Sequence, residues 1–152
     1  MSGTGLSAKA RILVRRPMAD VFAAFADADK MGQYWFTRKD DGLVEGEIVT
    51  FYMGPDAGAF SFDVKVLAIN APHRIVFEWD GPDNLSTQAT FSFDETEDGN
   101  TVLTIEETGF GGSDENKIQR ALDSTGGFNQ VIVAAKALIE HGVAINIVAD
   151  HV

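Results

Sequence analysis

The hydrophobic and polar positions of the chain divide it into an alternating part and a helical C-terminal part. Residues 113–141 read as one long helix, which Ser113 can cap at its start and Gly142 can end in the left-handed conformation. From Phe128 to Ile139 in this helix, apolar side chains cover most of the circumference and only Lys136 is charged. A helix that is apolar around its whole circumference is stable only when other parts of the protein surround it. We therefore predict a curved sheet that wraps around it.

Upstream of this helix, apolar and polar residues alternate with the period of two that is typical of strands. The predicted strands cover about residues 8–15, 44–53, 60–70, 74–80, 86–94 and 101–109. Short turns join most of them in sequence, which favours an antiparallel meander. The residues that the alternation places on inner faces include Phe60, Phe62, Val64, Val66, Ala68, Ile75, Phe77, Trp79, Ala89, Phe91, Phe93, Leu103, Ile105 and Glu107.

A short helical region separates the first predicted strand from the meander. Pro17 can occupy the first turn of a helix, and the apolar residues of the segment PMADVFAAFADADKMGQYW recur at helical spacing. We interpret the segment as two short helices that are broken near residues 27–29 and close one end of a cup.

Composition limits the class of protein. A chain of 152 residues suits one domain. We expect this domain at residues 8–142, a flexible N-terminus at 1–7, and a tail at 143–152 that packs on the domain or on a partner. The sequence has no cysteine, which excludes disulfides, thiolate catalysis and cysteine-based zinc sites.

The charge of the chain bears on its partners and location. The formal net charge of −11 repels phosphate backbones and anionic lipids, so we expect neither nucleic-acid binding nor a role at a membrane surface. No stretch has the length and apolarity of a signal peptide or a membrane span, and we predict a cytoplasmic protein without membrane insertion.

The order of the predicted elements resembles the helix-grip fold of the START-like SRPBCC superfamily, which includes the birch-pollen-allergen proteins. The strings RPMADVFAAFADADKMGQYW, APHRIVFEW and TVLTIEETGF, and the pair Gly127-Phe128, resemble the branch of activator of heat-shock-protein-ninety ATPase homologues. The resemblance implies an α+β domain in which a curved antiparallel β-sheet wraps around a long C-terminal α-helix. The chain departs from this branch at Phe128, where a tryptophan is common, and at Glu107, where a histidine often stands.

The fold implied by this resemblance often leaves a cavity between helix and sheet, and apolar cavities with a few polar groups are typical ligand sites. The alternative is that the aromatic rings simply fill a close-packed core. The candidate ligand-binding residues are Tyr34, Trp35, Phe60, Phe62, Phe77, Trp79, Phe91, Phe93, Glu107, Phe128 and Ile132.

Glu107 is the candidate with chemistry of its own. A carboxylate that faces an apolar cavity can act as a general acid or base, or bind a cationic group. Alternatively, it forms an ion pair with Arg38 or Arg74 near the end of its strand. Tyr34 and Trp35 either line the entrance of the cavity or anchor its rim. The histidines are too dispersed for a metal site, and we expect no cofactor.

Three functions remain open at this point. The leading hypothesis is non-catalytic binding of a small hydrophobic or aromatic molecule, lipids included, between the C-terminal helix and the sheet. One alternative, implied by the resemblance, is a chaperone-linked protein of the stress response. Another is an enzyme similar to polyketide cyclases or hydrolases, in which Glu107 and Tyr34 act on a bound ring. Another protein, or a second copy of this chain, is also left open as a partner.

Overall fold

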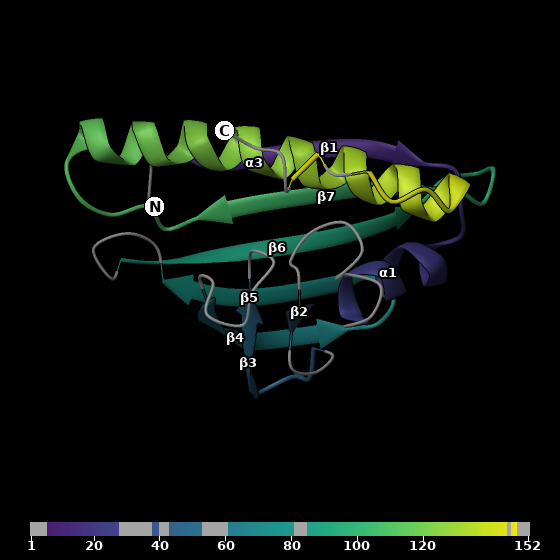
Figure 1. The fold of residues 1–152 in the computed structure, drawn as a ribbon, viewed down its shortest axis with the longest axis horizontal. Coiled ribbons are helices and arrows are strands. Elements are labelled where there is room, and N and C mark those ends of the chain that lie inside the picture. The colour runs from purple at the N-terminus through teal and green to yellow at the C-terminus, as the bar shows by residue number, and fades with distance from the viewer. Residues whose placement is uncertain are drawn as a thin grey trace.

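The computed structural model describes residues 6–27, 38–39, 43–52, 61–80, 85–145 and 147–148, with the side chains of 38–39, 51–52 and 61–62 left out. In this part of the chain, seven strands form one antiparallel sheet in the order β1-β7-β6-β5-β4-β3-β2 (Figure 1). The strands are β1 Ala8–Val14, β2 Arg38–Lys39, β3 Ile48–Tyr52, β4 Ser61–Asn70, β5 Arg74–Asp80, β6 Ser86–Glu95 and β7 Thr101–Thr108. The helices are α1 Met18–Ala26 and α3 Asp114–His141.

The long C-terminal helix confirms the prediction, including both of its ends. The Ser113 side chain accepts a hydrogen bond from the backbone N–H of Asn116 at 3.2 Å. At the other end Gly142 has a φ of 67°, and its N–H donates to the carbonyl of Leu138 at 2.8 Å. These two caps satisfy backbone groups that have no partner within the helix itself. Together with the meander, α3 makes this a helix-grip α+β fold.

Lys136, the charged residue in the apolar stretch 128–139 of α3, holds the helix to the first strand. Its ammonium group donates to the carbonyl of Leu13 at 2.5 Å and to Glu140 Oε2 at 2.6 Å. The same carboxylate oxygen accepts the backbone N–H of Arg15 at 2.7 Å. The end of β1 is therefore fixed to the last turns of α3 by one connected network.

Two predictions about the strands were wrong in detail. The strand predicted at 44–53 begins only at Ile48, because a turn with Gly46 at a φ of 84° precedes it. In β4 the register shifts between Val66 and Ala68, so that Ile69 lies opposite Ile75 on the inner face. Ala68 therefore does not continue the inner face as the alternation predicted, because a β-bulge moves the following residues by one position.

The region between α1 and β3 differs from the prediction, or lies outside the described residues, at two points. The second short helix was predicted for a segment that lies largely outside the described residues. β2, which pairs with β3, was not predicted, because two residues are too short to show an alternating pattern.

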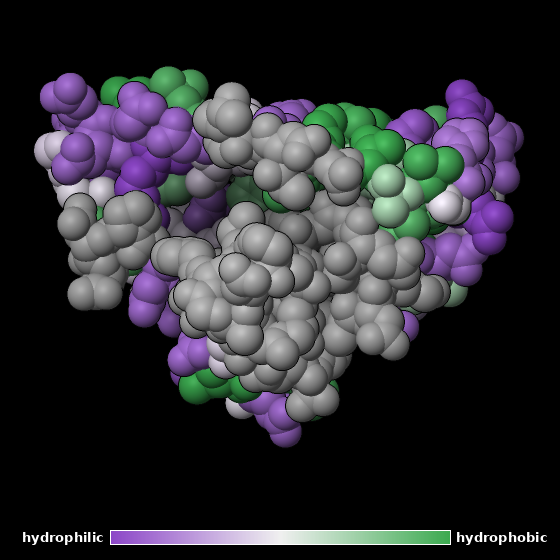
Figure 2. Space-filling model, in the orientation of Figure 1, coloured by the Kyte–Doolittle hydropathy of each residue, from purple (hydrophilic) through white to green (hydrophobic). Residues whose placement is uncertain are grey.

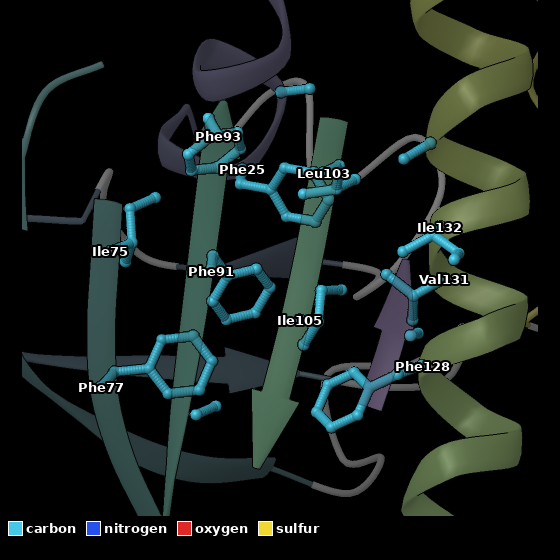
Figure 3. Close-up of a cluster of buried hydrophobic side chains, with 14 of the residues drawn as sticks. Phe25, Ile75, Phe77, Phe91, Phe93, Leu103, Ile105, Phe128, Val131 and Ile132 are labelled. Atoms are coloured by element: carbon cyan, nitrogen blue, oxygen red, sulfur yellow. The ribbon is translucent and has the colours of Figure 1, made fainter. Parts of the chain in front are cut away.

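The core lies between the inner face of the sheet and the two described helices. In Figure 3, Phe91 and Ile105 point from their strands toward α3, and Phe128 and Ile132 point from α3 toward the sheet. At one end of this core α1 packs its aromatic rings on the sheet. Phe25 lies 5.3 Å from Phe91 between ring centroids. After α3, the partly buried residues Ile145, Ile147 and Val148 pack against the same core. None of the described helices is both long enough and apolar enough to span a membrane.

Candidate functional site

Glu107 is a charged side chain in the core of the described structure. It lies near the end of β7, between Ala8 of β1 and Ala89 of β6. The alternation of β7 turns it inward with Leu103 and Ile105, and only 3% of it is exposed. The small side chains on both neighbouring strands leave room for a carboxylate in the inner layer.

Two donors hold one oxygen of this carboxylate. The indole N–H of Trp79 donates to Glu107 Oε2 at 3.1 Å, and the hydroxyl of Thr87 donates to the same oxygen. Trp79 and Thr87 lie opposite each other on β5 and β6, so three adjacent strands supply this arrangement. The sheet register therefore fixes the orientation of the carboxylate.

The second oxygen, Oε1, is buried and has no hydrogen-bond partner among the described residues. A buried polar atom without a partner costs about 1–3 kcal/mol, and more when the group is charged. Such atoms are rare in folded proteins, and a ligand group or water at the site is one explanation of them. Glu107 thus has an acceptor that the described fold does not use.

The Trp79 ring that binds this carboxylate belongs to a cluster of aromatic rings. Trp79 is stacked with Phe128 of α3, with ring centroids 6.1 Å apart and ring planes 16° apart. Phe77 packs edge-on against Trp79 at 5.0 Å, and Phe91 packs edge-on against Phe128 at 6.5 Å. Glu107 is therefore bonded to one member of an aromatic cluster that joins β5, β6 and α3.

Arg120 provides a second buried polar atom at the same end of the sheet. Its Nη1 is buried and has no partner among the described residues. Its Nη2 reaches the carbonyl of Leu85 at 3.5 Å, and its guanidinium lies 5.6 Å from the ring centroid of Phe110. Leu85 and Phe110 flank the positions of Thr87 and Glu107 on β6 and β7, so the arginine belongs to the same region of the fold.

The surface is hollowed in this region. Figure 2 shows a recess below the N-terminal half of α3, with hydrophilic and hydrophobic residues visible in its depth. In Figure 1 this is the side on which β5 and β7 end and β6 begins. α1 lies at the opposite end of these strands, on the same inner face of the sheet.

The structure brings part of the predicted site together. Phe77, Trp79, Phe91, Phe128 and Glu107 form one connected group of side chains. Ile132 is buried one turn further along α3. Phe93 lies instead at the end covered by α1, 5.5 Å from Phe22 between ring centroids. Tyr34 and Trp35, Phe60 and the side chains of Phe62 and Arg38 lie outside the described residues.

The structure rules out the alternative in which Glu107 forms an ion pair with Arg74. Arg74 begins β5 and lies opposite Asn70 and Ser92, whereas Trp79, which contacts Glu107, lies near the other end of that strand. Arg74 therefore does not pair with Glu107.

Sequence reasoning missed two members of the site. Thr87 continues the inward alternation of Ala89 and Phe91 by one more step, so the same pattern contained it. Arg120 lies two turns before Phe128 in α3, and helical periodicity places it near the same face. No three histidine, aspartate or glutamate residues in the described part of the chain are placed to hold a metal ion.

The sheet, the gripped helix and the buried site between them define a START-like helix-grip protein of the SRPBCC superfamily. Residues 15–139 match the family described as activator of Hsp90 ATPase homolog 1-like protein. The chain belongs to this family. A search of curated proteins found no match.

Solved structures with the same fold include three informative neighbours. A protein from Staphylococcus saprophyticus is 27% identical with a TM-score of 0.74, over 91% of this chain and 95% of its own. The Aha1 dimer from Colwellia psychrerythraea is 14% identical with a TM-score of 0.72, over 90% and 97%. DynU16, a protein in the dynemicin biosynthetic locus, is 17% identical with a TM-score of 0.76, over 91% of this chain and 49% of its own.

Proposed function

We propose that the protein binds a small apolar or aromatic molecule between α3 and the inner face of the sheet, without transforming it. The observation that carries this proposal is the unpartnered Oε1 of Glu107, buried beside the stacked rings of Trp79 and Phe128. An apolar site with a few precisely oriented polar groups is the usual form of a small-molecule site. The recess in Figure 2 supports access from solvent.

A thermal-shift screen tests the proposal. The panel contains fatty acids, sterols, flavonoids and polyketide-like aromatic compounds, because a ligand that binds only the folded state raises the apparent melting temperature. We expect a saturable shift with at least one aromatic class. No shift across the panel would contradict the proposal and would favour a role in protein–protein interaction.

Two tryptophan variants of α3 show whether a ligand found in this way occupies the proposed site. Phe128→Trp enlarges a side chain inside the site, and we expect it to weaken binding by filling space. Leu122→Trp is the matched control, because Leu122 is 63% exposed on the same helix. Binding that responds to neither variant would place the ligand elsewhere.

Catalysis by the same carboxylate is a second proposal. Oε2 is held by two donors, whereas Oε1 has no hydrogen-bond partner among the described residues and can accept a proton from a bound ring compound. The test is turnover of each bound compound, followed by mass spectrometry, with the wild-type protein and Glu107→Gln. Product formation that disappears in Glu107→Gln supports it, and an unchanged ligand after prolonged incubation counts against it.

A further inference from the structure

The outer side of α3 carries apolar residues that the described chain leaves open to solvent. Ile118 is 52% exposed, Leu122 63% and Val133 42%. In Figure 1 α3 runs along one margin of the molecule, and Figure 2 shows hydrophobic residues at two places along this margin. We propose that this side of α3 is the interface of a homodimer, in which a second copy of the chain packs its own α3 antiparallel against it. This surface is separate from the ligand site.

The residue pattern on this side of the helix selects a second copy as the occupant. Positions that recur every three or four residues lie on one side of an α-helix. The row that contains the three apolar residues, the α3 stripe, consists of Glu115, Ile118, Leu122, Thr125, Gly126, Asn129, Val133 and Lys136. Its spacing is the same when it is read from either end, with the midpoint between Thr125 and Gly126. A two-fold axis at this midpoint therefore places each member opposite its counterpart from the other end, as a self-complementary interface requires.

Apolar surface is covered on both copies in this arrangement. Ile118 of each copy lies opposite Val133 of the other, so these two residues shield each other at both ends of the contact. Leu122 lies nearer the axis, opposite Asn129 of the second copy. All three apolar residues are exposed in the single chain, and removing apolar surface from water is the main favourable term in association.

The residues in the middle of the stripe allow close contact at little cost. The amide of Asn129 donates to the carbonyl of Thr125 at 2.7 Å, and the hydroxyl of Thr125 donates to the carbonyl of Ala121 at 2.7 Å. Polar groups that already have a hydrogen-bond partner cost less to bury than those without one. Gly126 is exposed, and a Cβ atom built on it would meet no atom within 4 Å, so a second helix can approach its backbone closely.

Charge also fits a second copy in this register. Glu115 is exposed and lies opposite Lys136 of the second copy, once at each end of the contact. The Lys136 side chain is 30% exposed, and its bonds to the Leu13 carbonyl and to Glu140 use two of the three donors of an ammonium group. The stripe has no other charged member. Two chains with a net charge of −11 each can therefore meet here without placing like charges in contact.

The size of the contact predicts a weak dimer. The stripe spans residues 115–136, which is about 32 Å of helix, and a helix is about 10 Å wide. Each copy therefore contributes on the order of 300 Å², which is less than half of the about 800 Å² per partner of a standard interface. We expect a dissociation constant of roughly 100 μM.

Sedimentation equilibrium of the wild-type protein up to about 1 mM tests the association. Gly126→Lys places two ammonium groups beside the axis, and we expect it to raise the dissociation constant at least tenfold. Gly127→Lys is the matched control, because it adds the same side chain about 100° further round the helix, where a Cβ atom also meets nothing within 4 Å. This control should leave the dissociation constant unchanged. Urea denaturation of both variants shows that each remains folded.

Cysteine pairs test the register, because the chain has no cysteine of its own. Leu122→Cys in one copy lies opposite Asn129→Cys in the other, whereas two copies of either variant keep their cysteines seven residues of helix apart, about 10 Å. A disulfide needs Cα atoms within about 7 Å. Oxidation of an equal mixture of the two variants should therefore give a crosslinked dimer on a non-reducing gel, and oxidation of either variant alone should not.

Each part of the proposal can be contradicted separately. A wild-type protein that is monomeric at the highest concentration would overturn the dimer. Equal effects of the two lysine substitutions would overturn the assignment to the α3 stripe. A crosslink of Leu122→Cys with itself, or none in the mixture, would overturn the antiparallel register. None of these outcomes bears on ligand binding, which the thermal-shift screen tests by itself.

Discussion

Glu107 is a charged residue at a position where the surrounding fold would suit an uncharged one. The residue is 3% exposed, and only one of its two carboxylate oxygens has a hydrogen-bond partner among the described residues. Buried charges without full pairing lower stability. Residues retained at such a cost are typical of functional sites, where stability is exchanged for binding or chemistry.

The first prediction concerns the stability cost of the buried charge on Glu107. Glu107→Gln keeps an acceptor for Trp79 and Thr87 and removes the buried charge, so the free energy of unfolding should stay the same or rise by about 1 kcal/mol. Urea denaturation at pH 7 measures it, with Glu106→Gln as the control on the opposite face. A loss of more than about 2 kcal/mol would instead identify Glu107 as a structural residue.

Glu140 makes a contribution to stability that depends on pH. Burial raises its pKa, but the hydrogen bond from Lys136 and the N–H of Arg15, together with the charge of Lys136, outweigh burial and leave the pKa below its ordinary value of 4.5. A carboxyl group with a lowered pKa in the folded state stabilises the protein above its unfolded-state pKa. This stabilisation is lost as the pH falls through the folded-state pKa.

The second prediction is the pH profile of one substitution. Glu140→Gln should reduce the free energy of unfolding by about 1–3 kcal/mol at pH 7, because hydrogen bonds to charged groups are lost. The difference from the wild type should shrink as the pH is lowered below about 5. Urea denaturation at several pH values measures it. Glu97→Gln, in an exposed turn, is the control, and a difference that does not vary with pH would contradict the assignment.

At this scale, the sequence predicts the position of a residue better than its partners. Alternation along β7 placed Glu107 inward, because a strand has a period of two. It did not reveal the bonds to Trp79 and Thr87, which depend on the pairing of three strands. Arg120 was missed for a similar reason, since its contact with the Leu85 carbonyl joins residues 35 positions apart.

At the scale of elements, α3 combines strong capping with two adjacent glycines in its middle. Gly126 and Gly127 precede Phe128, and a Cβ atom built on either would meet no atom within 4 Å. Glycine within a helix costs about 0.5–1 kcal/mol relative to alanine because it loses more backbone freedom on folding. The helix would therefore be more stable with alanine at either position, since the surrounding structure has room for the added methyl group.

The third prediction uses this open space. Gly126→Ala should raise the free energy of unfolding by up to about 1 kcal/mol, since nothing obstructs the added methyl group. The matched substitution Gly112→Ala should lower it, because Gly112 has a φ of +95° that an alanine rarely adopts. Thermal and urea denaturation of both variants measure the effect. Destabilisation by Gly126→Ala would show that the helix needs the glycine for close packing.

Element types were predictable from the sequence, and element details were not. β5 was predicted with its observed bounds, Arg74–Asp80, because a clear alternation lies between two turns. The bulge in β4 leaves no such signal, since Leu67, Ala68 and Ile69 are all apolar and fit either register. The inner face beyond the bulge is settled by pairing with β5. Tertiary pairing therefore overrides the local pattern there.

At the scale of the whole molecule, the core has two ends with different properties. At the α1 end, Phe25 packs against Phe91 and Phe93 at 5.3 and 6.0 Å between ring centroids. At the other end, Phe128 meets Trp79 beside a carboxylate whose second oxygen has no partner in the described part of the chain. Phe91 contacts the rings from both ends. Phe91 thus connects the aromatic core at the α1 end to the polar aromatic site at the other end.

The fourth prediction separates the two ends with matched truncations. Phe25→Leu and Phe128→Leu each remove aromatic contacts next to Phe91, and both should lower the free energy of unfolding by about 1–3 kcal/mol. Phe25→Leu should leave the dissociation constant for a ligand found in the thermal-shift screen unchanged, because Phe25 packs at the α1 end of the core. Phe128→Leu should change that constant at least severalfold, because it removes a wall of the site. Calorimetric titration of both variants, below their unfolding temperatures, measures the two dissociation constants. Equal effects on binding would mean that the two ends of the core are not functionally distinct.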